Sequence, residues 1–168
     1  MSELKLNISK LSEGVHSYNL ETDATDLGLD DRFDSTIKID AILDKSGRQL
    51  LLEAKVRTEG LFVCDRCLEN FRRPAGAAYS LVYLQESPAA TEPETEDTKY
   101  ISADTNMIDL GEDVRQFLLL ALPVKILCQE ECKGLCPTCG QNRNTSTCTC
   151  SDKQIDPRWE ALKNLSDK

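Results

Sequence analysis

Hydrophobic and polar residues alternate along two neighbouring stretches of the chain, residues 33–44 and 49–63. A repeat of two is typical of a strand with one buried face, because successive side chains point to opposite sides of a sheet. The segment Lys-Ser-Gly at 45–47 is a turn signal, so the two stretches predict a long antiparallel hairpin. Its expected buried positions are Ile37, Ile39, Ala41, Leu43, Leu50, Leu52, Ala54 and Val56.

A third alternating stretch, residues 77–85, predicts another strand, and shorter alternations predict strands at about 4–9 and 15–20. The inward positions of the third stretch are Tyr79, Leu81 and Tyr83. Together with the hairpin, these strands predict an antiparallel sheet, which the sequence leaves either open or closed into a barrel.

The stretch at 109–122 changes to a helical period and predicts the main helix of the chain. Asp109 and Glu112 form a capping-box pattern at its start, and Pro123 ends it. The apolar face of this helix is expected to pack on the sheet as part of the core. It consists of Leu110, Val114, Phe117, Leu118 and Ala121.

Two further segments complete the organisation of the chain. Residues 86–99 contain two prolines, five acidic residues and no large apolar side chain, which predicts a solvated acidic loop. A short helix is expected in IDPRWEALKNL, with Asp156 as its N-cap and Pro157 as its first residue. Trp159, the only tryptophan, lies there, which favours a tail that docks on the rest of the protein.

These elements predict an α+β fold, an antiparallel sheet with one main helix and a small C-terminal cysteine-rich module. We place the β-rich body at residues 1–127 and the cysteine-rich tail, packed on the body, at 128–168. No apolar run reaches the roughly 20 residues of a membrane span, and the first residues lack the layout of a signal peptide. A cytoplasmic protein with reduced thiols is therefore expected.

The charge of the chain is unevenly distributed. The net charge is −9, and the first 124 residues alone carry −10, with 13 basic and 23 acidic side chains. The remaining 44 residues hold seven basic and six acidic side chains. An acidic body argues against tight nonspecific binding of nucleic acid, which needs clustered Lys and Arg, and leaves room only for a local basic patch.

Eight cysteines are the clearest chemical signal in the sequence. One C-x2-C pair follows the second hairpin strand, and the pattern C-x3-C-x3-C-x2-C-x8-C-x-C follows the main helix. A C-x2-C turn brings two thiolates close enough to share one tetrahedral zinc ion, which binds sulfur at about 2.3 Å. In a reducing compartment the pattern favours metal over disulfides or inert thiols. The candidate ligands of one or two zinc ions are Cys64, Cys67, Cys128, Cys132, Cys136, Cys139, Cys148 and Cys150.

The sequence leaves the grouping of these cysteines open. A short loop closes at low entropic cost, which favours a local site in the tail. That site would consist of Cys136, Cys139, Cys148 and Cys150. The second site would then consist of Cys64, Cys67, Cys128 and Cys132, and would join the strand end to the helix end. A rival is a single site made of Cys132, Cys136, Cys139 and one of Cys148 and Cys150.

The chemistry expected of such sites is structural. Four-thiolate zinc sites are closed, whereas catalytic zinc keeps an open position and usually has histidine or carboxylate ligands. The only histidine, His16, is far from the cysteines in sequence and is expected at the surface or in a turn. No phosphate-binding glycine loop and no hydrolase or metalloprotease motif occurs. The protein is therefore predicted to be non-enzymatic, with no small-molecule substrate.

Four pieces of sequence occur in a set order: CDRCLENF, IDLGEDVRQFLLLALPVKILC, CKGLCPTCGQNRN followed by CTC, and DPRWEALKNL. Together they resemble the YceD family, the large ribosomal RNA subunit accumulation proteins, over about residues 50–165. The resemblance implies a cytosolic, non-enzymatic protein that supports accumulation of large-subunit ribosomal RNA and assembly of the large subunit. Its implied partner is the precursor of that subunit, through either ribosomal RNA or a ribosomal protein.

Arginines surround the first C-x2-C pair. Arg66, Arg72 and Arg73 can offset the negative charge that a filled four-thiolate site carries, and they are also candidate contacts to RNA or the ribosome. Two other functions fit the cysteines: a thiol redox protein that uses its C-x2-C pairs, and a zinc-ribbon adaptor that binds other proteins. Neither pair lies in a thioredoxin-like strand-helix-strand setting, which disfavours the redox function.

Overall fold

The computed structural model describes residues 4–86 and 97–150. The chain divides into two compact units. The first comprises Met1–Phe62 and Asn70–Ile126, and the second comprises Val63–Glu69 and Leu127–Lys168. The second unit therefore combines the tip of a hairpin with the cysteine-rich tail, and the packing of that tail on the body stays a prediction.

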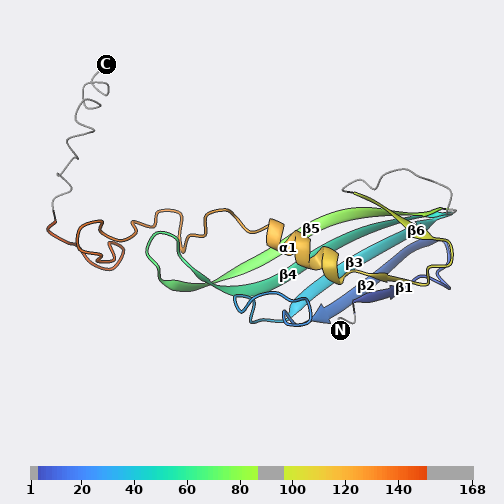
Figure 1. The fold of residues 1–168 in the computed structure, drawn as a ribbon, viewed down its shortest axis with the longest axis horizontal. Helices are drawn as coiled ribbons and strands as arrows, with labels where there is room; N and C mark the ends of the chain where they lie inside the picture. The colour runs from blue at the N-terminus through green and yellow to red at the C-terminus, as the bar shows by residue number, and fades with distance from the viewer. Residues whose placement is uncertain (1–3, 87–96, 151–168) are drawn as a thin grey trace, which may run out of the picture. The chain divides into compact units, whose positions relative to one another are not determined.

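The first unit is built on an open, five-stranded sheet with the order β2-β3-β4-β5-β6 (Figure 1). Its strands are β2 (Gly14–Thr22), β3 (Ile37–Ser46), β4 (Gln49–Val63), β5 (Asn70–Glu86) and β6 (Thr98–Ser102). The sheet does not close into a barrel, because β2 and β6 are its two ends. The predicted mostly-β body with one helix is confirmed, and the choice between open sheet and barrel is settled in favour of the open sheet.

The hairpin of β3 and β4 forms where the alternating pattern predicts it. Its register pairs Ser46 with Gln49, so Gly47 and Arg48 make the turn. Of the predicted turn at 45–47, only Gly47 belongs to it, because Lys45 and Ser46 are still part of β3. Gly47 has a φ of 57°, a left-handed conformation that glycine adopts at low cost. All eight predicted inward positions of the hairpin are buried in the core.

Two strands differ from the sequence-based expectation. β5 begins at Asn70, earlier than the predicted start at 77. The prediction started too late because Pro74 and Gly76 interrupt the alternation that marks a strand. β6 begins at Thr98, inside the predicted acidic loop, and it runs parallel to β5, so the prediction of a purely antiparallel sheet is wrong at this edge. β6 has no alternating burial pattern that could have identified it. The rest of that loop, residues 87–96, lies outside the described residues.

A two-stranded antiparallel sheet leads directly into the start of the helix. β1 (Lys5–Asn7) pairs with β7 (Met107–Asp109), a strand that the sequence analysis missed. The N–H of Leu110 then donates to the carbonyl of Leu4 at 2.8 Å. The N-terminal segment is thereby tied to the residue that precedes the helix.

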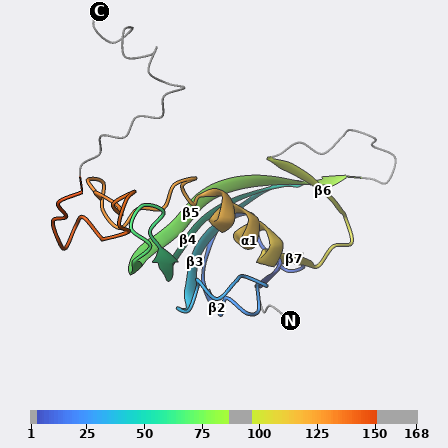
Figure 2. The same ribbon diagram turned by 60° about the vertical axis from the view of Figure 1, so that its left-hand side comes forward.

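The helix α1 (Gly111–Leu120) lies over one face of the sheet (Figure 2). Asp109 accepts a hydrogen bond from the N–H of Gly111 at 2.9 Å, but Glu112 accepts one from Gln116 at 2.8 Å instead of completing a capping box. Of the predicted apolar face, Leu110, Val114 and Leu118 are buried and Phe117 is half-buried. Ala121, the C-cap residue of the helix, is exposed, and that part of the prediction is wrong.

The interface between α1 and the sheet contains a polar group that the apolar pattern did not reveal. Phe117 stacks on Tyr79 of β5 with ring centroids 4.2 Å apart and an interplanar angle of 6°. Beside them, Asp113 is 4% exposed and forms an ion pair with Lys99 of β6. The hydroxyl of Tyr83 donates to the same carboxylate at 3.3 Å. One carboxylate thus links the helix to two neighbouring strands.

Among the described residues, no helix is long and apolar enough to cross a membrane. The predicted helix around Asp156, Pro157 and Trp159 lies outside the described residues.

Candidate metal centres

The second unit brings the eight cysteines together in two groups of four. We call Cys64, Cys67, Cys128 and Cys132 the first tetrad, and Cys136, Cys139, Cys148 and Cys150 the second tetrad. Within each tetrad all four sulfur atoms lie within 4.8 Å of one another. This is the grouping that the short tail loop favoured, whereas the role of the eight residues as metal ligands stays a prediction.

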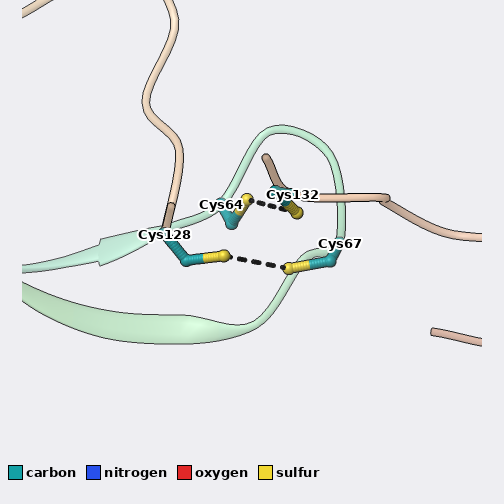
Figure 3. A group of neighbouring side chains, drawn as sticks. All are labelled: Cys64, Cys67, Cys128 and Cys132. Atoms are coloured by element: carbon teal, nitrogen blue, oxygen red, sulfur yellow. Dashed lines mark hydrogen bonds between the residues drawn. The ribbon is translucent and has the colours of Figure 1, made fainter. Parts of the chain in front are cut away.

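The hairpin tip supplies half of the first tetrad. After β4, the N–H of Cys64 donates to the carbonyl of Glu69 at 3.0 Å, and the N–H of Leu68 donates to the carbonyl of Cys64 at 2.9 Å. Leu68 has a φ of 60°, the left-handed conformation that reverses the chain into β5. These bonds close a tight turn from which Cys64 points toward Cys132 and Cys67 points toward Cys128 (Figure 3).

The segment that follows the first unit supplies the other half. Cys128 and Cys132 face the hairpin tip, with the sulfurs of Cys64 and Cys132 at 3.7 Å and those of Cys67 and Cys128 also at 3.7 Å (Figure 3). Arg66, from the tip, donates to the carbonyls of Cys132 at 2.9 Å and Glu130 at 3.3 Å. Arg66 thus holds the segment that contains Cys128 and Cys132 against the hairpin tip, by bonding to main-chain carbonyls of that segment.

The second tetrad is held by a turn of the same kind. The N–H of Cys136 donates to the carbonyl of Gln141 at 2.8 Å, and the N–H of Gly140 donates to the carbonyl of Cys136 at 2.9 Å. Gly140 has a φ of 72°, so a glycine is suited to this position. Cys136 is buried, Cys139 is exposed, and Cys148 and Cys150 are half-buried. The second tetrad is therefore more open to solvent than the first.

The sulfur geometry fits a tetrahedral metal site. Metal–sulfur bonds of about 2.3 Å in a tetrahedron place the sulfurs about 3.8 Å apart. In the first tetrad, the sulfurs of Cys64 and Cys132 lie 3.7 Å apart, and so do those of Cys67 and Cys128. A disulfide would need a sulfur–sulfur distance of about 2.05 Å, and all eight cysteines are free thiols. Both tetrads could hold a metal ion.

The protonation of the thiols explains why a cation would be favoured. Burial works to raise the pKa of Cys64, but N–H groups of Cys128, Arg66 and Cys67 bond its sulfur and lower the pKa to about 6. N–H groups of Cys139 and Thr138 likewise lower the pKa of Cys136 to about 6. Burial and the neighbouring thiols raise the pKa of Cys128 to about 12. A tetrad therefore resists holding four negative sulfurs by itself, and a divalent cation would relieve that repulsion.

The other predicted site residues are distributed between the two units. Arg66 belongs to the second unit, whereas Arg72 and Arg73 lie in β5 of the first unit. Arg72 forms an ion pair with Asp34, and Arg73 lines a small pocket of about 90 Å³. His16 lies in β2, where its Nε2 is 2.9 Å from the carbonyl oxygen of Ser12, and it belongs to neither tetrad.

Two asparagines between the cysteines escaped the sequence analysis. Asn144 places its side-chain Nδ2 3.3 Å from the sulfur of Cys132, and its Oδ1 accepts the N–H of Lys133 at 2.8 Å. Asn142 accepts two hydrogen bonds from Asn144 and donates to Glu69 at 3.3 Å. The only available signal was the repeated asparagine in NRN between two candidate ligands, which alone also fits an ordinary turn.

Comparison with known proteins shows that the chain matches a protein family. The family model described as "Large ribosomal RNA subunit accumulation protein YceD" matches residues 52–166. No solved structure gives a significant match.

Curated relatives occur in plants and bacteria. A maize protein named "Large ribosomal RNA subunit accumulation protein YCED homolog 1, chloroplastic" is 29% identical over 135 residues, which cover 64% of this chain and 46% of the maize protein. The Arabidopsis thaliana protein of the same name is 25% identical over 159 residues, 79% of this chain and 48% of that protein. The uncharacterized protein YlbN of Bacillus subtilis is 26% identical over 142 residues, 84% of this chain and 80% of the relative. The chain thus spans about half the length of the plant relatives.

Proposed function

The chain belongs to the YceD family of large ribosomal RNA subunit accumulation proteins, and on this premise we propose that it supports accumulation of large-subunit ribosomal RNA and assembly of the large ribosomal subunit. The observation that carries the proposal is the extent of the family match, residues 52–166, which includes β5, α1 and all eight cysteines. The proposed partner is a precursor of the large subunit, met through ribosomal RNA or a ribosomal protein. The proposed compartment is the cytoplasm.

In this proposal the protein binds and does not catalyse. Its family is named for ribosomal RNA accumulation and not for a catalytic activity. Each tetrad already supplies four sulfur ligands, so a bound ion would have no open position for a substrate. The acidic body suits contact through a restricted face, since a net charge of −9 disfavours wrapping a phosphate backbone.

We further propose that the metal in both tetrads is zinc, with a structural role. The support is chemical: four sulfur ligands at tetrahedral spacing suit zinc, whose bound form cross-links the chain without redox chemistry. Arg66 would then orient the first tetrad from outside it, through its bond to the carbonyl of Cys132.

Depletion of the protein from growing cells is expected to lower the ratio of large-subunit to small-subunit ribosomal RNA. The reason is that, in this proposal, accumulation of large-subunit ribosomal RNA depends on the protein, whereas accumulation of small-subunit ribosomal RNA does not. Quantifying both RNA species, together with a sucrose-gradient profile, measures this directly. Restoration by the wild-type chain supplies the control. An unchanged ratio and profile after depletion would remove the proposed function.

Arg66, Arg72 and Arg73 remain the proposed contact residues, and Arg72 offers the cleanest test. Its side chain is 55% exposed, and its pairing with Asp34 leaves other guanidinium N–H groups available. Arg72→Ala is expected to weaken co-sedimentation with large-subunit particles and to reduce its salt dependence by about one phosphate contact.

Arg57→Ala is the matched control for that experiment. Arg57 lies in the same sheet, is 70% exposed and also pairs with an aspartate, Asp40. If both variants co-sediment like the wild type, Arg72 is not a contact residue. Arg66 is unsuitable for this comparison, because its substitution would also disturb the first tetrad.

A further inference from the structure

The loop that joins the cysteines of the second tetrad also contacts the first tetrad. Asn144 lies between Cys139 and Cys148, two members of the second tetrad. Its Nδ2 nevertheless lies 3.3 Å from the sulfur of Cys132, a member of the first. The side chain is half-buried, so this bond has limited competition from water.

The orientation of the Asn144 side chain follows from its second partner. The backbone N–H of Lys133 can only donate, and it lies 2.8 Å from Oδ1 of Asn144. The opposite assignment of the amide would set two donors against each other and place oxygen against sulfur. The amide nitrogen therefore points to Cys132. Asn142 holds this arrangement, because its Oδ1 accepts both the backbone N–H and the Nδ2 of Asn144, each at 2.9 Å.

Main-chain bonds tie the same loop to the segment between the two tetrads. Leu135 and Asn142 form an isolated antiparallel bridge. The N–H of Arg143 donates to the carbonyl of Gly134 at 2.9 Å, and the N–H of Leu135 donates to the carbonyl of Arg66 at 3.0 Å. A continuous set of bonds thus runs from the loop of the second tetrad to the hairpin tip that carries Cys64 and Cys67.

We propose that Asn144 is a positioning residue that couples the two tetrads, so that metal in the second strengthens metal binding in the first. The proposal rests on the metal binding proposed above. An N–H bond to a ligating sulfur stabilises its negative charge and fixes its direction, and loss of such an outer contact typically lowers metal affinity about 10–100-fold. Metal in the second tetrad would close the loop that carries Asn144. The amide of Asn144 would then already be held beside the sulfur of Cys132 when metal binds to the first tetrad.

Asn144→Asp gives the sharpest test in the full-length protein. The aspartate keeps an acceptor for the N–H of Lys133 but replaces the amide donor with an oxygen facing Cys132. Zinc affinities, measured by competition with a chromophoric chelator, are expected to show one ion bound about 10–100-fold more weakly than in the wild type. Gln141→Glu makes the same amide-to-acid change at an exposed position of the same segment and is expected to match the wild type.

Asn144→Ala separates a lost hydrogen bond from added charge. It is expected to weaken the same ion, whereas wild-type affinity in this variant would overturn the proposal by making repulsion the sole cause. Cobalt(II) supplies a readout that a merely structural role would not move. Loss of an N–H bond raises the energy of the sulfur electrons, so the sulfur-to-cobalt charge-transfer band of one site should move to longer wavelength.

Coupling itself is tested with Cys139→Ser combined with Cys150→Ser, which disables the second tetrad. The ion left in the first tetrad should bind at least about tenfold more weakly than in the wild type. Adding Asn144→Ala to this double variant should then cause a smaller further loss of affinity than Asn144→Ala causes in the wild type. Full additivity would overturn the coupling. Failure of the underlying metal proposal looks different, because the wild-type protein itself would then bind neither zinc nor cobalt.

Discussion

Cys64→Ser is expected to release one of two bound metal ions and to lower the free energy of unfolding of the second unit by several kcal/mol, because metal-binding energy is folding energy in such modules. Cys64 has no exposed surface, and its sulfur lies 3.7 Å from that of Cys132. A serine hydroxyl is a poor substitute for a thiolate ligand of zinc. Metal content by mass spectrometry and thermal unfolding of the same sample measure both effects.

The loss of stability in Cys64→Ser can be compared with that in Cys139→Ser, which removes a ligand of the second tetrad instead of the first. The first tetrad joins residues 61 and 68 positions apart, whereas the second spans only residues 136–150. By the entropy of loop closure, a cross-link over roughly 65 residues stabilises by about 4 kcal/mol and one over 15 residues by about 3 kcal/mol. Cys139→Ser should therefore also lose one ion, with the smaller loss of stability.

Two results would contradict this account of the first tetrad. One is a Cys64→Ser protein that keeps the metal content and melting temperature of the wild type. The other is a larger destabilisation by Cys139→Ser than by Cys64→Ser, which would make the second tetrad the main structural link.

Lys99→Met is expected to destabilise the first unit by about 2–4 kcal/mol, because it leaves a buried carboxylate without its cation. The side chain of Asp113 is 6% exposed and that of Lys99 is 37% exposed. The remaining partner, the hydroxyl of Tyr83 at 3.3 Å, is a neutral donor. Urea unfolding monitored by circular dichroism of the sheet measures the change.

The exposed pair Lys38–Glu21 supplies the control for this prediction. Its side chains are 64% and 63% exposed, so Lys38→Met should cost less than about 1 kcal/mol. The double variant Lys99→Met with Asp113→Leu should recover most of the loss, because it removes the unpaired charge as well. Equal stabilities of Lys99→Met and Lys38→Met would show that the Asp113 pair does not hold β6 and α1 together.

The parts of the fold that could be predicted are those whose signal is local. β3 and β4 alternate without interruption, and one glycine marks their turn, so the position of the hairpin follows from pattern alone. β6 has five residues with no alternation in burial, and its pairing with β5 depends on the tertiary fold. A periodicity argument has nothing to detect in such a strand.

The candidate site divides in the same way. Spacing along the chain favoured the observed grouping of the cysteines, because C-x2-C turns and a short loop restrict which sulfurs can meet, but it did not exclude a single site built around Cys132, Cys136 and Cys139. The bond from Arg66 to the carbonyl of Cys132 joins residues 66 positions apart, and nothing in the sequence near either residue indicates it. Asn144 was hidden for a different reason, since asparagine is common in turns and its contact with Cys132 appears only in three dimensions.

Native mass spectrometry of the anaerobically purified, full-length protein measures whether the two tetrads are separate metal sites. We expect a mass that exceeds the denatured, metal-free mass by two zinc ions, with all eight thiols reactive after metal removal. A metal-free native mass that is lighter than the reduced chain by two hydrogens for each disulfide would contradict it and would make the tetrads pairs of oxidised cysteines.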